Sequence, residues 1–530
     1  MHINKIVWAP SANKIKGRTC LHASAGSKHH SSYNDSIDLQ AHDARYRPPN
    51  LTSLPKLCEL ACKQRQRYAK ARLCGAVVDV CSAYTQVAQS VETAKTHCVE
   101  IQAPHPSLID AVIILVAVFL CVIFGDSRAG NVYCICAESI HRQHNAEYCR
   151  SETYIDDGGI IDAEEFIEES RDEYKKCVRT LFGPESVNDK KDILFEDCLE
   201  CIGWRLDFIT WTVMPKEKGM CKIMLALFKN IVPQQRKVPI KVLERTLGLL
   251  MWYSAVIPCG KSFLSSLYAC MHSGENGSNY THLTDLAMSD LDWWRAIMLA
   301  GFWDRSTISA SIDSLRVNRI PHFYYRSDAS TSTGGGAALS VTEGGLPLNL
   351  SGQSAIRWTT EEMRVFEIIG VSINVLEYFA AMFFIMLWVD TLRGKVVSIE
   401  CDNASAVSWL LKGRAKGGGV ADVLVKIFVL FCYEAKIILL CKHLAGVANV
   451  VADFRSRDLN FAAQGSDEHY WESRPRETAS MQPSAVPDRA AHCRRLLYKA
   501  VTQPESFRGH LLLKELTNLR SIPGPRFCFC

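Results

Sequence analysis

The chain has 530 residues, of which 48% are hydrophobic and 22% are charged, and its formal net charge is +4. This composition excludes a largely disordered protein, and the length predicts roughly two to four domains. The net charge is too small to require a polyanionic partner, and it does not exclude one.

The amino-terminal charges and the cysteines bear on partners and compartment. The first 34 residues contain no Asp or Glu and are basic, so they either contact phosphates or form a solvated end. The 22 cysteines are scattered, and no apolar signal-peptide core precedes them. We therefore expect an intracellular protein of the cytoplasm or nucleus, with reduced thiols and no secretion. Cys198 and Cys201 have zinc-like spacing but no matching second pair, which favours buried thiols.

Ala111–Gly125 is apolar throughout, with Asp110 before it and Asp126 after it. It is shorter than the roughly 20 residues that a membrane-spanning helix needs. Its Val, Ile and Phe content suits a buried strand or core helix. We therefore expect this segment in the core and no membrane partner; a membrane protein built around it is the weaker alternative.

Prolines and polar runs indicate where the chain divides. Pro233 and Pro239 precede a region of helical periodicity, and the polar stretch Thr331–Gly336 suggests another break. We expect β-rich runs and turns at 1–230, a helical connector at 231–320, an α/β unit at 321–460 and a weakly ordered tail at 461–530. Helices in the connector are expected at 243–254, 261–271 and 290–299.

The 321–460 region should contain a mixed sheet, because strand patterns come first and then alternate with helical ones. The expected strands are His322–Ser327, Ala337–Val341, Val396–Cys401 and Lys436–His443. The expected helices are Val375–Trp388, Ala404–Lys412 and Val420–Cys432.

The stretch Thr153–Gly159 reads TYIDDGG and sets two aspartates beside two glycines. Taken alone, it is most simply a hairpin with Asp157-Gly158 at the turn. Upstream, Val77–Val87 reads VVDVCSAYTQV and places Asp79 after an apolar, strand-like run. Two Mg²⁺ ions about 4 Å apart need carboxylates from different strands. One acid on a strand and two at a neighbouring hairpin can supply them.

VVDVCSAY followed by YIDD resembles the two carboxylate motifs of the reverse transcriptase palm, in that family's order. The resemblance implies that Asp79, Asp156 and Asp157 are catalytic and bind two Mg²⁺ ions, with Mn²⁺ as a possible substitute. It also implies that Tyr84 packs under the nucleotide sugar and that Tyr154 lines the site. The reaction would be attack of a primer 3′-hydroxyl on the α-phosphate of a dNTP.

Weaker matches flank these motifs in the family's order. Lys16–Ser24 and Ser32–Asp35 resemble the fingers segment, in which Arg18 would hold the incoming triphosphate. Phe124–Gly130 resembles the template grip, Ile202–Asp207 resembles the primer-grip hairpin, and the thumb would follow. The resemblance assigns template or primer contacts to four residues: Phe124, Gly125, Gly203 and Trp204.

Four further acids lie in the 321–460 region: Asp328, Glu377, Asp402 and Asp453. One at a time, the first three suit caps: Asn374–Glu377 resembles a capping box, Asp402 could begin a helix, and Asp328 could cap a turn. Together, the four resemble the carboxylates of a retroelement ribonuclease H domain. That resemblance implies that all four are catalytic and bind two Mg²⁺ ions, cleaving the RNA strand of a hybrid. His443 is more simply a satisfied core or loop histidine.

Taken together, the motifs from about Lys16 to Arg457 resemble retrotransposon polyproteins of the DIRS type and related types. The implied fold class is α+β, a right-hand polymerase followed by a ribonuclease H-like α/β domain with a mixed sheet. The implied partners are an RNA template, a DNA primer, dNTPs and an RNA–DNA hybrid. His22 and Ala129-Gly130 depart from the family's pattern. An alternative is therefore a decayed or domesticated element protein that only binds nucleic acid.

Overall fold

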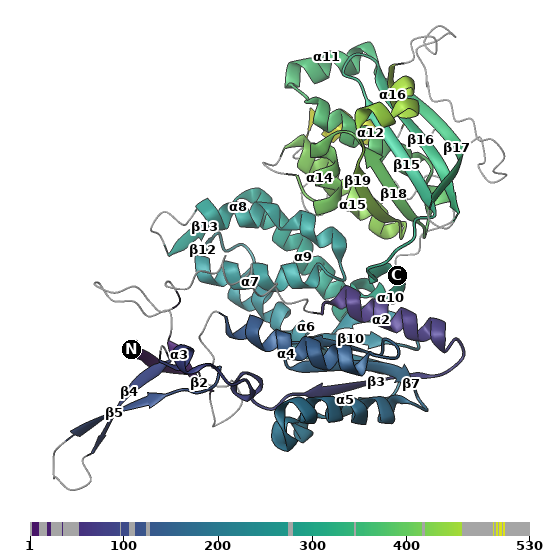
Figure 1. Cartoon of the computed structure of the whole chain (residues 1–530). Helices are drawn as coiled ribbons and strands as arrows, with labels where there is room; N and C mark the ends of the chain where they lie inside the picture. Colours follow the sequence, from purple (N-terminus) through teal and green to yellow (C-terminus); the bar gives the residue numbers. More distant parts are fainter. Residues whose placement is uncertain are drawn as a thin grey trace. The chain divides into compact units, whose positions relative to one another are not determined.

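The computed structural model describes residues 3–9, 18–22, 34, 52–95, 97–104, 112–122, 128–273, 279–343, 346–415 and 419–457, and parts of 491–503. The chain divides into two compact units (Figure 1). The first comprises Met1–Lys216 and Ser311–Val317, and the second comprises Glu217–Ala310 and Asn318–Cys530. Both contain helices and sheets, and two sheets mix parallel with antiparallel pairs, so the chain is an α+β protein. The sequence-based boundaries at 230, 320 and 460 stay predictions.

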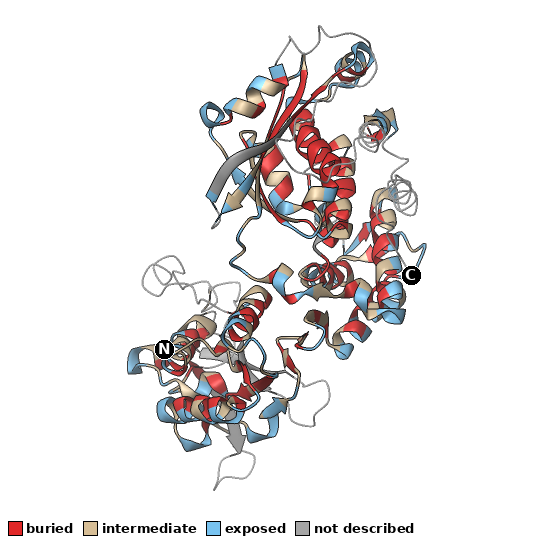
Figure 2. Cartoon of the chain, turned by 90° about the vertical axis from the view of Figure 1, so that its right-hand side faces the viewer, coloured by how far each residue is buried: buried red, intermediate tan, exposed pale blue. Residues whose placement is uncertain are grey.

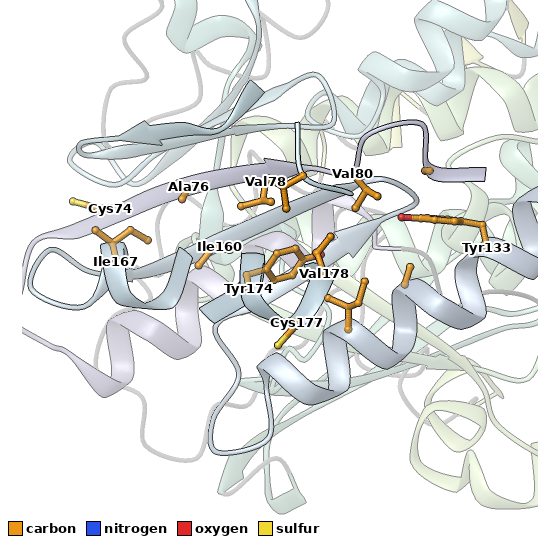
Figure 3. Close-up of a cluster of buried hydrophobic side chains, with 14 residues drawn as sticks. Cys74, Ala76, Val78, Val80, Tyr133, Ile160, Ile167, Tyr174, Cys177 and Val178 are labelled. Carbon is orange, nitrogen blue, oxygen red and sulfur yellow. The ribbon is translucent and has the colours of Figure 1, made fainter. Parts of the chain in front are cut away.

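An antiparallel sheet in the order β6-β7-β3-β8 forms the centre of the first unit. Its strands are β3 (Leu73–Asp79), β6 (Ser151–Tyr154), β7 (Asp157–Ala163) and β8 (Ile193–Phe195). Alternate residues of β3, among them Ala76 and Val78, pack against helices α4 (Ala129–His144) and α5 (Ile167–Phe182) in a buried cluster (Figure 3). The opposite face meets α2 (Leu54–Arg67) and β9 (Cys198–Cys201), since glycines there approach Leu57 and Leu199.

The three long helices of this unit correct the expectation for 1–230, which foresaw short β-rich runs and turns. In α5, for example, Ile167, Tyr174 and Val178 are buried while charged residues separate them. These few apolar residues recur at helical spacing, so they form one face of α5 that packs on the sheet.

The apolar segment at 111–125 is not the core element that the sequence predicted. Residues Val112–Val118 form β5, the edge of a sheet in the order β2-β1-β4-β5. The other strands are β1 (Ile3–Ala9), β2 (Arg18–His22) and β4 (Cys98–Pro104). Five apolar side chains on or beside β5 are exposed: Ile114, Leu115, Val116, Val118 and Leu120. Among the described residues, no helix has both the length and the apolar character to span a bilayer.

Helices dominate the first part of the second unit: α6 (Glu217–Leu225), α7 (Ile240–Tyr253), α8 (Ser265–Ser273) and α9 (Asp285–Trp303). The helix expected at 261–271 is in fact two elements, a 3₁₀ turn over Pro258–Phe263 and then α8. A buried ion cluster ties α9 to α15 (Val420–Glu434), because Lys426 Nζ donates to Asp290 Oδ1 at 2.8 Å and lies 2.9 Å from Asp422 Oδ2.

The rest of the second unit is built on a five-stranded mixed sheet in the order β17-β16-β15-β18-β19. These strands are β15 (Phe323–Ala329), β16 (Gly334–Glu343), β17 (Leu346–Arg357), β18 (Val396–Cys401) and β19 (Ile438–His443). β15 is antiparallel to β16 and parallel to β18, which is parallel to β19. The helices are α11 (Thr360–Ile369), α12 (Ile373–Leu387), α14 (Ala404–Lys412), α15 and α16 (Val450–Arg457). α12 is buried on all sides from Val375 to Leu387 (Figure 2).

The stretch Thr331–Gly336 does not divide the chain, contrary to the sequence-based expectation. It connects β15 to β16 and begins β16 within one hairpin. Gly336 has a packing role, since a Cβ there would lie 2.3 Å from the carbonyl oxygen of Ala452 in α16. The glycine therefore lets α16 approach the sheet.

Candidate active sites

The hairpin of TYIDDGG turns two residues earlier than expected. Tyr154 of β6 pairs with Asp157 of β7, so Ile155 and Asp156 form the turn, with Ile155 at a φ of 53°. Asp157 and Gly158 already belong to β7. A Cβ at Gly158 would lie 2.4 Å from the Tyr174 ring of α5. Packing against α5, rather than turn geometry, therefore requires this glycine.

Pairing of β3 with β7 brings the three predicted polymerase acids together. Asp79, the last residue of β3, lies opposite Asp157 in the ladder. The Val80 N–H donates to the Asp156 carbonyl oxygen at 2.9 Å, which fixes the turn beside β3. Only 3% of Asp79 is exposed. Burial, together with the nearby charges of Asp156 and Asp79, raises the pKa of Asp157 to about 6.

Two residues that the sequence did not single out also belong to this first acid cluster. Lys191 Nζ donates to Asp79 Oδ1 at 2.5 Å, and Asn188 Nδ2 donates to Asp79 Oδ2 at 2.9 Å. Burial lowers the pKa of Lys191, but the hydrogen bond to Asp79 and the charges of the three acids outweigh this and raise it. Both residues lie more than 100 positions from Asp79, so no local pattern could have indicated the contact.

The first cluster has the donor set that a hard divalent ion prefers. Its ligand atoms are carboxylate oxygens from a strand end and an adjoining turn. Burial is the main cause of the raised pKa of Asp157; the charges of Asp156 and Asp79 add to it, and the Lys191 ammonium opposes it. The residues therefore fit Mg²⁺ or Mn²⁺.

The remaining polymerase predictions fall in different places. Tyr84 lies in a 3₁₀ turn (Ala83–Gln86), with its ring 5.8 Å from that of Tyr133 in an edge-on contact. Tyr154 is 37% exposed beside the acids. Gly203, at a φ of 85°, turns the chain between β9 and β10 (Trp204–Asp207), and Trp204 is 2% exposed. Arg18 lies in β2, but the structure does not describe its side chain. Phe124 and Gly125 lie outside the described residues.

A second acid cluster forms in the five-stranded sheet where the parallel strands β15 and β18 end. Asp328 lies near the end of β15, Asp402 directly follows β18, Glu377 is on α12 and Asp453 is on α16. Burial and the nearby charges of Asp328 and Asp402 raise the pKa of Glu377 to about 8. Burial, opposed by a hydrogen bond from Ser456, and the charges of Asp402 and Asp453 raise the pKa of Asp328 to about 6.

The second cluster also suits a metal ion. Ligand atoms of Glu377, Cys401 and Asp402 lie within 4.8 Å of one another. The Cys401 thiol donates to Glu377 Oε2 at 3.8 Å. Asp328 and Glu377 are buried beside other carboxylates, which add to the effect of burial in raising both pKa values, and a divalent ion could offset these neighbouring charges.

The capping interpretations of Asp402 and Glu377 are wrong. Asn403, not Asp402, caps α14, since its side chain accepts from the Ala406 N–H. Ser372 occupies the N-cap position of α12, without a side-chain cap bond, so Glu377 completes no capping box. Asp328 accepts from Ser456 Oγ at 2.5 Å. His443, the last residue of β19, is exposed, and its Nε2 lies 2.9 Å from the Asp402 carbonyl oxygen, so this histidine has a hydrogen-bond partner.

The sequence predicted that Cys198 and Cys201 are buried thiols rather than zinc ligands. Cys198 and Cys201 are free and buried in β9.

Comparison with known proteins gives only a distant structural similarity. No protein-family model matches the chain, and no curated protein matches it. A foamy viral protease-reverse transcriptase in complex with double-stranded DNA is 13% identical over 83% of this chain, with a TM-score of 0.43. Another, in complex with an RNA/DNA hybrid, is 12% identical over 91%, with a TM-score of 0.41. The chain spans 65% and 53% of the lengths of those two proteins.

Proposed function

We propose that the chain is a retroelement RNA-directed DNA polymerase with a second, ribonuclease H-type centre. The observation that carries this proposal is the convergence of Asp79, Asp156 and Asp157 at the joined ends of β3 and the β6–β7 hairpin. A hairpin with no other role would leave its acids in water, whereas here Asp157 is partly buried with a raised pKa and lies opposite the buried Asp79 of β3.

In this proposal, Asp79 and Asp156 hold two Mg²⁺ ions, and Asp157 is the adjacent third acid. Bound Mg²⁺ would lower the pKa of the primer 3′-hydroxyl and stabilise the leaving oxygen of the dNTP. The protein's own contribution is rigid placement, since β3 and the hairpin are held against α5 by buried packing. Tyr154, 37% exposed beside the acids, would line the nucleotide site.

For the second centre, we propose cleavage of the RNA strand of an RNA–DNA hybrid by Asp328, Glu377, Asp402 and Asp453. Support comes from four acids on separate elements that meet at one sheet edge. Burial, together with the charges of neighbouring acids, raises the pKa of two members, Asp328 and Glu377. Subgroup assignment to DIRS-type elements and an intracellular location belong to the same proposal.

Primer extension on an RNA template with Mg²⁺ tests the polymerase assignment. Asp156→Asn should lower extension by about 100-fold or more, because it removes a charge that the proposed metal site needs. Asp189→Asn, an exposed acid near Lys191 in sequence, is the matched control and should extend normally. A chain that binds template and primer but extends none would instead support the binding-only alternative.

A further inference from the structure

Asp79 is held by two donors from one loop, the segment Ser186–Lys191. Asn188 Nδ2 donates to one carboxylate oxygen at 2.9 Å, and Lys191 Nζ donates to the other at 2.5 Å. Both oxygens of a proposed metal ligand are therefore engaged by the protein itself. The two donors differ in charge and in how firmly they are held.

Asn188 is fixed by its backbone as well as by its side chain. Its N–H donates to the Asp79 carbonyl oxygen at 2.9 Å, and the Cys81 N–H donates to the Ser186 carbonyl oxygen at 2.7 Å. Val187 forms a bridge to Val80. The loop therefore runs alongside the end of β3 and is attached to it by backbone hydrogen bonds.

Lys191 is held much less firmly. Its side chain is 52% exposed, whereas the Asp79 side chain with which it pairs is 4% exposed. A long, flexible lysine can turn its ammonium into water at little cost. Asp79 has no such freedom, so the ion pair can open only from the Lys191 side.

We infer that Asn188 positions Asp79 for a divalent ion and that Lys191 is a displaceable counter-ion that competes with this ion for Asp79. The inference rests on the proposed function. An amide donor orients a carboxylate without adding charge, whereas an ammonium near Oδ1 repels an arriving cation. Before an ion binds, Lys191 offsets part of the negative charge of Asp79, Asp156 and Asp157, all of which lie close enough to affect its pKa.

The two donors therefore predict changes of opposite sign. Removing Asn188 should weaken divalent binding, because Asp79 loses its orientation. Removing Lys191 should strengthen it, because the ion no longer competes with an ammonium. A loop that only supports the fold predicts weaker binding for both variants.

A calorimetric titration of the full chain with Mn²⁺ alone measures these changes in divalent binding directly. Asp328→Asn and Asp402→Asn are present throughout so that the second cluster is silenced. Lys191→Met should lower the Kd for Mn²⁺ about threefold or more, and Asn188→Ala should raise it by a similar factor. Lys190→Met, the loss of an exposed neighbouring lysine, is the control for net charge and should change the Kd less than about twofold.

Unchanged or weaker Mn²⁺ binding in Lys191→Met, and likewise in Lys191→Gln, would overturn the inference. If Asn188→Ala does not fold, these two variants decide it, since the Lys191 side chain is half exposed and its loss should cost little stability. Asp79→Asn in the same background separates the two proposals. If it leaves Mn²⁺ binding intact, the proposed metal site itself is wrong. If it abolishes binding while Lys191→Met does not tighten it, only the competition is wrong.

Discussion

The two acid clusters accommodate like charges in different ways. In the first, Asp79 is compensated by the Lys191 ammonium and the Asn188 amide, and the pKa of Asp157 is raised only to about 6. In the second, Asp328 accepts a hydrogen bond from the neutral Ser456 hydroxyl, and the pKa of Glu377 is raised to about 8. The Lys191 counter-ion in the first cluster and a bound proton in the second thus both reduce the repulsion between neighbouring carboxylates. Without metal, Asp157 is therefore mainly ionised at neutral pH, whereas Glu377 retains its proton.

The largest effect is expected where a cation is buried rather than half exposed. Lys426 and both its partners, Asp290 and Asp422, are buried. Lys426→Met should therefore destabilise the second unit by about 3–5 kcal/mol, because it leaves buried carboxylates without their cation. Lys191→Met, a change at an exposed cation, should cost about 1 kcal/mol or less. Thermal and urea unfolding would measure both, and equal losses would break the distinction between buried and displaceable cations.

The pH dependence of stability should separate the clusters next. A carboxyl group whose pKa is raised on folding keeps a proton that the unfolded chain releases, so its contribution to stability falls as pH rises between the two values. For Glu377 that window runs from the ordinary value of 4.5 to about 8. We expect stability without metal to fall by up to about 3 kcal/mol between pH 5 and pH 8.

Glu377→Gln should remove most of that fall, whereas Asp157→Asn should change only the window from 3.8 to about 6. Urea unfolding in the presence of a chelator, at four or five pH values, gives the slopes. Identical pH windows for the two variants would show that the clusters do not differ in proton occupancy.

A smaller effect is expected at the glycine that seats the first cluster. Gly158→Ala places a Cβ against the Tyr174 ring and should destabilise the chain by about 1–3 kcal/mol. Gly248 on α7 has no neighbour within 4 Å of its Cβ position, so Gly248→Ala should instead stabilise by up to about 1 kcal/mol. Thermal unfolding of the pair supplies the comparison. Destabilisation by both changes would contradict the packing role assigned to Gly158.

Sequence patterns predicted the elements whose apolar spacing is unambiguous. The strand at Val396–Cys401 and the helix at Ala404–Lys412 have the expected bounds. The position of a strand within its sheet was not predictable, because composition does not say which strand lies in the middle. The apolar run that forms β5 in fact lies at an edge of its sheet. The strand Leu346–Arg357 and the helices of the first unit were missed altogether.

For the sites, the acids could be named from motif order, but their surroundings could not. Asn188 and Lys191 reach Asp79 across more than 100 residues, and Ser456 reaches Asp328 across 128. Likewise, the turn of TYIDDGG lies two residues earlier than expected, because Tyr154 pairs with Asp157; Gly158 is in β7, where it packs on Tyr174. Contacts between distant segments decide such details, and a local pattern does not contain them.

The central claim is that the chain carries two separate metal-dependent centres, and a crossed assay tests it most directly. Asp156→Asn and Asp402→Asn are each assayed for primer extension on RNA and for cleavage of RNA in a hybrid, with Mg²⁺ and with equal folding verified by thermal unfolding. We predict that Asp156→Asn loses extension and keeps cleavage, and that Asp402→Asn loses cleavage and keeps extension. Loss of both activities in each folded variant, or of neither, would contradict the two-centre account.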